Sequence, residues 1–317
     1  MKIFRIVFFI LGLVLFVVLV RRVAGADVAA VFASIDWRLS ALAFLCYCGV
    51  NLMRMESISL ILGGKVPRRR VLSLVFLQNF FNVLFSFSGD AAYVFLLKRR
   101  GTVTLGENLA SLLAAKILDF FTLTSVFFGF VMISGIPALS SLRAPSALIF
   151  AASVSLAALS FARPSVLPAL VAGAGSVVGI GARPAFLRVL KQAQEIAGGF
   201  SFFRSRRVAG RVALTTLCNW FLTFLSGFLL LRGVGVTIGF GATLFAYTFP
   251  IAAGLTPAFV LGGFGSYEGA FAFGLTRVGI AAGQAIASSV ALHVQELGFL
   301  LVLAAAGFII HYYDDTD

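Results

Sequence analysis

The chain has 317 residues, of which 60% are hydrophobic and 12% are charged, and its mean hydropathy is +1.04. Soluble domains are roughly half apolar, so this composition excludes a soluble globular enzyme and predicts an integral membrane protein. The formal net charge is +13. The basic residues lie in short loops between apolar segments, where the positive-inside rule explains them, so we expect no nucleic-acid partner.

Seven apolar segments are long enough to form helical spans or near-spans, at about 20 residues per bilayer crossing. They cover residues 3–20, 39–62, 71–97, 109–135, 144–162, 209–231 and 284–310, and a glycine-interrupted stretch at 240–275 is a further one. The longest polar stretch, 183–211, is too short to bury a core of its own. The sequence therefore predicts a single all-α polytopic membrane domain over residues 1–317, with about seven to eight spans.

The first apolar segment resembles a signal peptide, because Lys2 and Arg5 lie at its start and a small-residue site follows at residues 24–26. Arg21 and Arg22 lie between the apolar run and that site, which fits a retained span better. We therefore expect the amino terminus in the cytoplasm.

An internal repeat joins residues 90–101 to residues 268–279, at an offset of 178 positions. Five identities in twelve positions exceed the roughly one expected from this composition. The recurring residues are Ala92, Phe95, Leu97, Arg99 and Gly101, which return as Ala270, Phe273, Leu275, Arg277 and Gly279, and the leading acids are Asp90 and Glu268. The same offset carries Arg54 onto Arg232, and with a slip of one residue Lys116 and Asp119 return as His293 and Glu296.

The segment 71–97 has two readings that differ in topology. A re-entrant hairpin that turns at residues 86–89 places 17 basic residues in the cytoplasm and 6 outside, whereas a full span, with a second span at 164–181, gives 14 and 9. The positive-inside rule favours the hairpin. Residues 164–181 then form an interfacial segment that leads into a basic amphipathic helix at about 185–203.

With this topology the two repeats run in opposite directions through the membrane. We expect repeat A at about 37–135, a linker with one span and the amphipathic helix at about 136–208, and repeat B at about 209–310. Inverted repeats with broken, glycine-rich helices place a substrate site near the middle of the bilayer, between the halves. This architecture favours a transporter-like function.

The densest motif is Leu261 to Glu268, with glycines at 262, 263 and 265. Gly262, Gly263 and Gly265 would let the backbone turn tightly and approach a ligand, and Glu268, with Asp90 as its repeat counterpart, would add a carboxylate. The alternative is that the glycines only allow close helix packing and that the acids are ordinary charges at helix amino termini.

Arg99 and Arg277 follow these acids by nine residues, which puts an acid and an arginine on opposite faces of one helix. Their planar guanidinium groups would suit a phosphate diester. The alternative is an arginine that reaches the membrane surface and marks topology, particularly for Arg99, which is flanked by Lys98 and Arg100.

Two charge motifs lie deep in predicted spans. Lys116 with Asp119, and His293 with Glu296, are three residues apart and share a helical face, so we expect each motif to form an ion pair within its helix. Such pairs are either structural or part of a gate. Cys46, Cys48 and Cys218 have no disulfide or metal-site spacing, and no nucleophile elbow or nucleotide loop is present, so we expect no catalytic residue, cofactor or metal.

These motifs resemble the flippase-like family that includes the membrane portion of lysylphosphatidylglycerol synthases. The resemblance covers essentially the whole chain and lies in Asn82 to Asp90, in Lys116 with Asp119, and in Gly262 to Glu268. Phe85 and Leu261 stand where the family has prolines. The resemblance implies translocation of an anionic or lipid-linked molecule without its synthesis.

The combined prediction is a multi-pass protein of the cell inner membrane that flips an amphiphile, with an anionic phospholipid or polyprenyl-linked lipid as partner. Two alternatives remain open. One is a membrane glycosyl- or phosphotransferase that uses a polyprenyl-phosphate donor, with Asp90 and Glu268 as acid and base. The other is a non-transporting scaffold that binds a lipid-synthesis enzyme. The expected substrate-binding residues are Asp90, Arg99, Gly262, Gly263, Gly265, Glu268 and Arg277.

Overall fold

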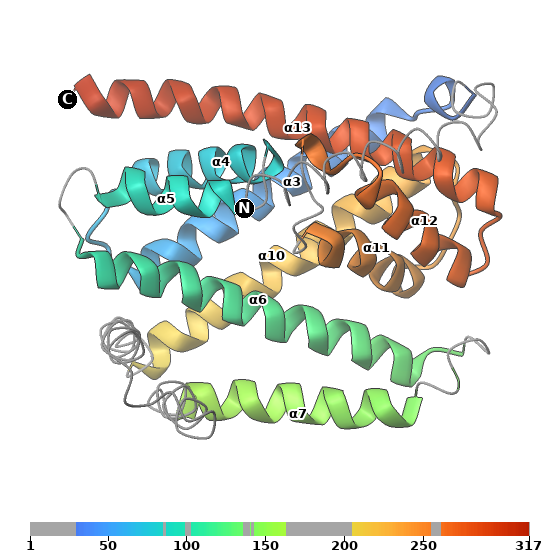
Figure 1. Ribbon diagram of the computed structural model, residues 1–317, viewed down its shortest axis with the longest axis horizontal. Helices are drawn as coiled ribbons and strands as arrows, with labels where there is room; N and C mark the ends of the chain where they lie inside the picture. Colours follow the sequence, from blue (N-terminus) through green and yellow to red (C-terminus); the bar gives the residue numbers. More distant parts are fainter. Residues whose placement is uncertain are drawn as a thin grey trace, which may run out of the picture.

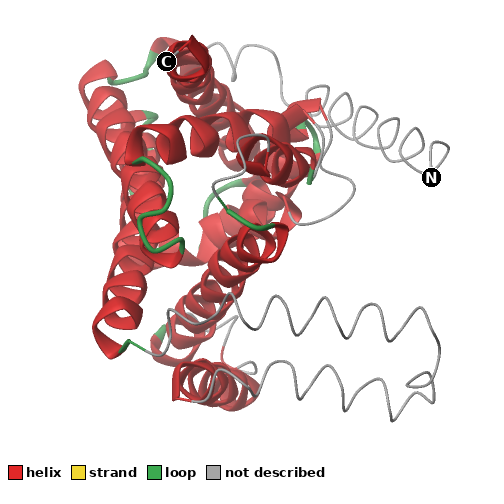
Figure 2. Ribbon diagram, turned by 90° about the vertical axis from the view of Figure 1, so that its left-hand side faces the viewer, coloured by secondary structure: helices red, strands yellow, loops and turns green. Residues whose placement is uncertain are grey.

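A computed structural model describes residues 30–84, 87–98, 103–135, 140, 143–162, 205–254 and 261–316. Every regular element in these ranges is a helix (Figures 1 and 2), so the predicted all-α class is confirmed. Several predicted features lie outside the described residues, namely the first span at 3–20, the segment 164–181, the amphipathic helix at 185–203, Phe85 and Arg99.

Three of the described helices are long and apolar enough to cross a bilayer. They are α6 (Leu105–Ile133), α10 (Arg206–Gly233) and α13 (Ala282–Thr316). The helices α3 (Trp37–Ile61) and α7 (Arg143–Ala162) coincide with two further predicted spans. These helices identify a multi-pass membrane protein.

The segment 71–97 is broken into two antiparallel helices, as the hairpin interpretation requires. Helix α4 (Arg68–Leu84) packs against α5 (Ser88–Lys98). At one end Arg70 donates to the carbonyl of Leu96 (3.2 Å), and at the other the Gly89 N–H donates to Asn82 Oδ1 (2.9 Å). The chain therefore enters and leaves this unit, hairpin A, at the same end.

Hairpin A turns sharply because its sequence supplies both a polar cap and a position without a side chain. Phe87 has a positive φ of 66°, and Asn82 accepts from the amide after the turn. A Cβ on Gly89 would collide with the carbonyl oxygen of Gln78 on α4. Only glycine fits at such a close approach between helix backbones.

A second unit, hairpin B, comprises α11 (Phe240–Gly254), a short 3₁₀ turn (Leu261–Gly263) and α12 (Ser266–Arg277). Gly262, Gly263 and Gly265 have φ values of 85°, 74° and 85°, which other residues rarely adopt. A Cβ on Gly274 would lie 2.6 Å from the carbonyl oxygen of Ala246 on α11. Both hairpins thus have a glycine where their helices meet.

The long helices α3 and α10 run antiparallel along each other. Asp36 N–H donates to the Gly233 carbonyl (2.9 Å) at one end, and Arg211 contacts Glu56 (3.1 Å) at the other. Figure 1 shows hairpin A and hairpin B on opposite sides of the molecule, with α13 extending along both and with α7 beside α6. The bends of the two hairpins therefore point toward the centre of the structure.

Candidate functional site

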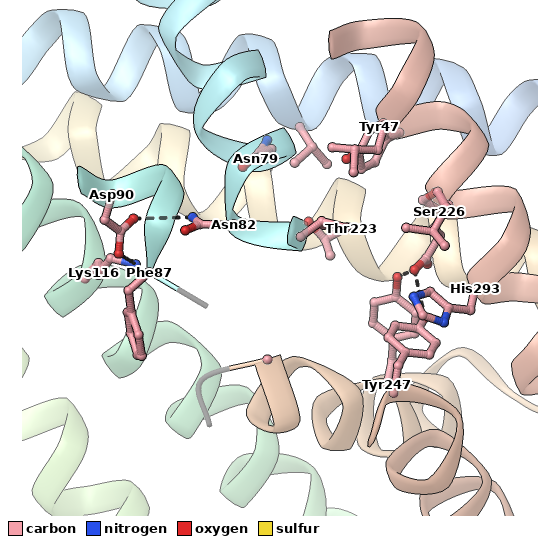
Figure 3. A pocket seen from close by; sticks show the side chains of 17 residues that line it. Tyr47, Asn79, Asn82, Phe87, Asp90, Lys116, Thr223, Ser226, Tyr247 and His293 are labelled. Atoms are coloured by element: carbon pink, nitrogen blue, oxygen red, sulfur yellow. Dashed lines mark hydrogen bonds and ion pairs between the residues drawn. The ribbon is translucent and has the colours of Figure 1, made fainter. Parts of the chain in front are cut away.

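A cavity of about 380 Å³ lies at this centre, where the two hairpins approach each other. Figure 3 shows Asp90, Asn82 and Lys116 on one side, and Tyr247 and His293 on the other. Helices from both predicted repeats form its walls, namely α3, α4, α5 and α6 from repeat A and α10, α11, α12 and α13 from repeat B. The lining residues are Tyr47, Val50, Asn79, Asn82, Val83, Phe87, Asp90, Lys116, Thr223, Ser226, Tyr247, Gly254, Tyr267, His293, Glu296, Leu297 and Leu300.

Asp90 forms the charged centre of the wall that hairpin A contributes. Its Oδ2 lies 2.9 Å from Lys116 Nζ, and its Oδ1 accepts from Gln78 (2.9 Å) and from Asn82 (3.4 Å). The side chain of Asp90 is only 12% exposed, whereas the side chain of Lys116 is 41% exposed. The ammonium of Lys116 has three N–H donors, of which Asp90 uses one, so Lys116 is the member of this pair that can also bind an anionic ligand.

The prediction that Lys116 pairs with Asp119 is wrong, because each residue has its partner on another helix. Asp119 Oδ2 lies 2.7 Å from Arg54 Nη1 on α3, and its Oδ1 accepts from Trp220 Nε1 on α10 (3.0 Å). Spacing by three residues brings two side chains to one face of a helix, but each of these two side chains binds an opposite charge on a neighbouring helix. Asp119 therefore joins α6 to α3 and α10.

Glu268 is the corresponding acid of hairpin B, and it lies behind the cavity wall. Its Oε1 is 2.7 Å from His293 Nδ1, and its Oε2 accepts from the Gly265 N–H (2.7 Å). Glu268 is 0% exposed and is absent from the cavity lining, whereas His293 is part of that lining. The geometry gives Glu268 the role of positioning His293 and of capping α12.

The prediction that His293 forms an ion pair with Glu296 is also wrong, because each of these residues has other partners. Glu296 accepts from the hydroxyls of Tyr247 and Tyr267, the latter at 2.8 Å. The Tyr267 ring stacks on the His293 ring, with centroids 4.1 Å apart. His293 and Glu296 thus belong to one cluster in the cavity, but the two tyrosines connect it.

Sequence reasoning missed the tyrosines and two amides. Asn79 donates to Asn51 Oδ1 (2.9 Å), and Asn51 donates to the Tyr47 carbonyl (2.8 Å). The available signal was the density of polar residues on α4, where amide side chains interrupt an apolar helix. Buried polar groups in apolar segments are costly unless they have partners, so each one is a candidate for function.

The remaining predicted site residues are distributed differently. Gly262, Gly263 and Gly265 shape the backbone of hairpin B but do not line the cavity. Arg277 is exposed at the last turn of α12, where its guanidinium lies 4.7 Å from the Phe273 ring centroid. The structure therefore places Arg277 apart from Asp90 and Lys116.

Among the described residues, no group of three or more His, Cys, Asp or Glu side chains is arranged to hold a metal ion. The cavity instead offers one ammonium, one imidazole, carboxylates, amides and hydroxyls inside an apolar helical structure. Such a lining can bind a polar or ionic head group through hydrogen bonds.

Helices long enough to cross a bilayer, around a central cavity that contains charged and hydrogen-bonding side chains, define a polytopic membrane protein. The chain matches the family model for the lysylphosphatidylglycerol synthase TM region over residues 3–304, and it belongs to that family. Comparison with curated proteins and with solved structures returns no significant match.

Proposed function

We propose that this protein translocates an anionic or lipid-linked amphiphile across the cytoplasmic membrane. The central cavity is the observation that carries the proposal, because it places charged and hydrogen-bonding groups inside a protein whose long helices are apolar. Polar groups at membrane depth usually face a ligand pathway. The family membership adds support for a membrane protein that handles lipids.

The arrangement of the helices supports an inverted repeat as the frame of this pathway. Each half consists of a long helix, a hairpin of two short helices and a second long helix. The first long helices, α3 and α10, are antiparallel. Each hairpin contributes an acid whose basic partner lies on the next long helix, namely Asp90 with Lys116 and Glu268 with His293. Inverted repeats of this kind favour alternating access to one central site.

The hairpins have the dimensions of re-entrant elements. With 17 residues in α4 and 11 in α5, their lengths are about 25 Å and 16 Å at roughly 1.5 Å per residue. The hydrocarbon core is about 30 Å thick, so neither helix spans it. Each hairpin would place its bend near the middle of the membrane, next to the cavity.

Lys116 is the group that we assign to the anionic part of the substrate. It is half-exposed, and it already faces the cavity beside Asp90. A phosphate oxygen could accept from its ammonium while Asp90 remains bound by Gln78 and Asn82. We propose an inner-membrane location with a cytoplasmic amino terminus, and we propose that the protein does not alter the lipid chemically.

A leaflet assay with fluorescent phosphatidylglycerol in reconstituted vesicles tests the proposal. Lys116→Gln should slow flipping at least tenfold, whereas Arg277→Gln, which changes an exposed arginine outside the cavity, should flip at the wild-type rate. Flipping that is equally fast in protein-free vesicles would contradict the proposal. Mass spectrometry of lipid recovered from vesicles that also contain a polyprenyl-phosphate donor separates the alternatives, because a transferase would convert a lipid and a scaffold would neither convert nor move one.

A further inference from the structure

A second hollow lies between α3 and α13, and its lining is mostly apolar. It has a volume of about 440 Å³, and we call it the α3–α13 groove. The polar groups in it are the amide of Gln295, the hydroxyl of Ser40 and the indole N–H of Trp37. The groove is lined by Phe32, Ile35, Trp37, Ser40, Ala41, Phe44, Val294, Gln295, Gly298 and Phe299.

The groove and the central cavity lie on opposite faces of α13. Residues 293, 296, 297 and 300 line the cavity, whereas residues 294, 295, 298 and 299 line the groove. At about 3.6 residues per turn, these two sets are separated by roughly half a turn. One helix therefore contacts a polar site on one face and an apolar site on the other.

The seam between α3 and α13 is the boundary where the two sites approach each other. Ser40 donates to Gln295 Oε1 (2.6 Å), and the Phe299 ring lies 5.1 Å from Phe44 and 6.0 Å from Tyr47, measured between centroids. Tyr47 lines the cavity, while Phe44 and Phe299 line the groove. At this point the contact between Tyr47 and Phe299 joins the lining of one site to that of the other.

We propose that the α3–α13 groove binds the hydrocarbon chain of the amphiphile whose polar group enters the central cavity. This inference rests on the proposed function. An amphiphile that moves between leaflets needs an apolar path for its chain and a polar path for its head. The groove and the cavity supply these on the two faces of α13, and the link between head and chain would cross at the seam, where the Ser40–Gln295 hydrogen bond and the Phe299 ring contacts must open to admit it.

The size of the groove distinguishes a chain from other apolar occupants. A volume of 440 Å³ equals that of about 15 water molecules, at roughly 30 Å³ each. An extended alkyl or isoprenyl chain is narrower than a helix, which is about 10–12 Å across, and can therefore lie within the groove instead of over it. A Cβ on Gly298 would meet no atom within 4 Å, so the groove is open at this residue.

Fluorescence quenching by a brominated lipid tests the inference on the full-length protein. Trp37 lines the groove and is 69% exposed, whereas the chain's second tryptophan, Trp220, is buried against Asp119 and provides a constant background. The probe is phosphatidylglycerol with brominated acyl chains, titrated into detergent-solubilised protein. Unbrominated phosphatidylglycerol serves as the reference.

Gly298→Leu should fill the groove without disturbing a neighbour, and Gly283→Leu is its matched control. Gly283 also lies on α13 and has open space around it, but it is not part of the groove. We expect saturable quenching in wild type and Gly283→Leu, and loss of most of that quenching in Gly298→Leu. Flipping of long-chain phosphatidylglycerol should fall in Gly298→Leu alone.

Equal quenching in all three proteins would overturn the inference, and so would wild-type flipping by Gly298→Leu. In both cases the proposed translocation could still be observed and would stand. Quenching that depends on Gly298, in a protein that flips no lipid, would support the chain site and contradict the proposed function instead.

Discussion

The carboxylate of Glu268 lies 2.7 Å from Nδ1 of His293, although the two residues belong to different helices, α12 and α13. The other carboxylate oxygen accepts from the Gly265 amide, so Glu268 connects α12 to the glycine-rich turn before it and to α13. Because of these contacts, a substitution at residue 268 should affect the packing of the helices.

Glu268→Gln should lower the stability of the fold, and any loss of transport should result from this destabilisation. The substitution removes the charge of a fully buried carboxylate that has two hydrogen-bonded partners. One of these partners then faces a poorer acceptor. A buried group that loses its partner costs about 1–3 kcal/mol. Thermal unfolding of purified protein should show a lower midpoint, and an unchanged midpoint with normal yield would contradict a positioning role.

Glu296→Gln should leave the fold intact and impair flipping. Glu296 lines the cavity, and the glutamine carbonyl can still accept from Tyr247 or Tyr267. The charge that faces the cavity is lost, and one tyrosine hydroxyl loses its acceptor but can turn toward the cavity. The leaflet assay and the melting curve must be measured on one preparation, and the expected result is slow flipping with a midpoint that falls less than that of Glu268→Gln. Normal flipping would exclude Glu296 from the site.

Asp90 and Lys116 should behave as a coupled pair in a double-mutant cycle. Their side chains are 2.9 Å apart, so Asp90→Asn and Lys116→Gln remove the same interaction. We expect the double variant to be less destabilised than the sum of the single variants, by about 1 kcal/mol or more. The corresponding cycle for Lys116 and Asp119 should be closer to additive, because these residues bind different partners. Additive losses for Asp90 and Lys116 would show that the contact has no energetic role.

Gly89→Ala and Gly274→Ala should each separate the two helices of a hairpin. In both cases the new methyl group would collide with a backbone oxygen of the other helix. Forced overpacking of this kind costs typically about 1–3 kcal/mol. Gly210→Ala is the control, because a Cβ there meets no atom within 4 Å and alanine favours a helix. Equal melting temperatures for all three variants would contradict the close approach.

The hairpin topology can be tested by labelling single cysteines after Cys46, Cys48 and Cys218 have been replaced. Lys65 binds Glu107 and Arg70 binds Leu96, which places the start of α4 and the end of α5 at one end of the molecule. Cysteines at positions 69 and 98 should therefore react only after cells are permeabilised, whereas a cysteine at 143 should react in intact cells. Labelling of position 98 in intact cells would contradict a cytoplasmic end for hairpin A.

The sequence was sufficient to predict the helical class and the break in the segment 71–97, and it singled out Asp90 and Lys116, which both line the central cavity. Each of these depends on local pattern, such as hydropathy, charge distribution or a motif that recurs along the chain. The break is now seen between Leu84 and Ser88.

The partners of the charges could not be predicted in the same way. Spacing on one helix shows that Lys116 and Asp119 share a face, but it does not show that Asp90 on α5 and Arg54 on α3 lie closer. Tyr247 and Tyr267 were missed because a single tyrosine in an apolar segment also occurs at membrane interfaces. The α3–α13 groove depends on how α3 and α13 pack against each other, and the spacing of residues along the sequence does not show this packing.

The pairing of charges between consecutive helices has a consequence for how the chain is assembled during synthesis. Lys116 follows its partner Asp90 by 26 residues, and His293 follows Glu268 by 25 residues. A charged side chain at the centre of a helix costs roughly 2.5–3.5 kcal/mol when the translocon releases that helix into lipid. Because the acid has already emerged from the ribosome, α5 and α6 are expected to leave the translocon together as one neutralised unit, and α12 and α13 likewise.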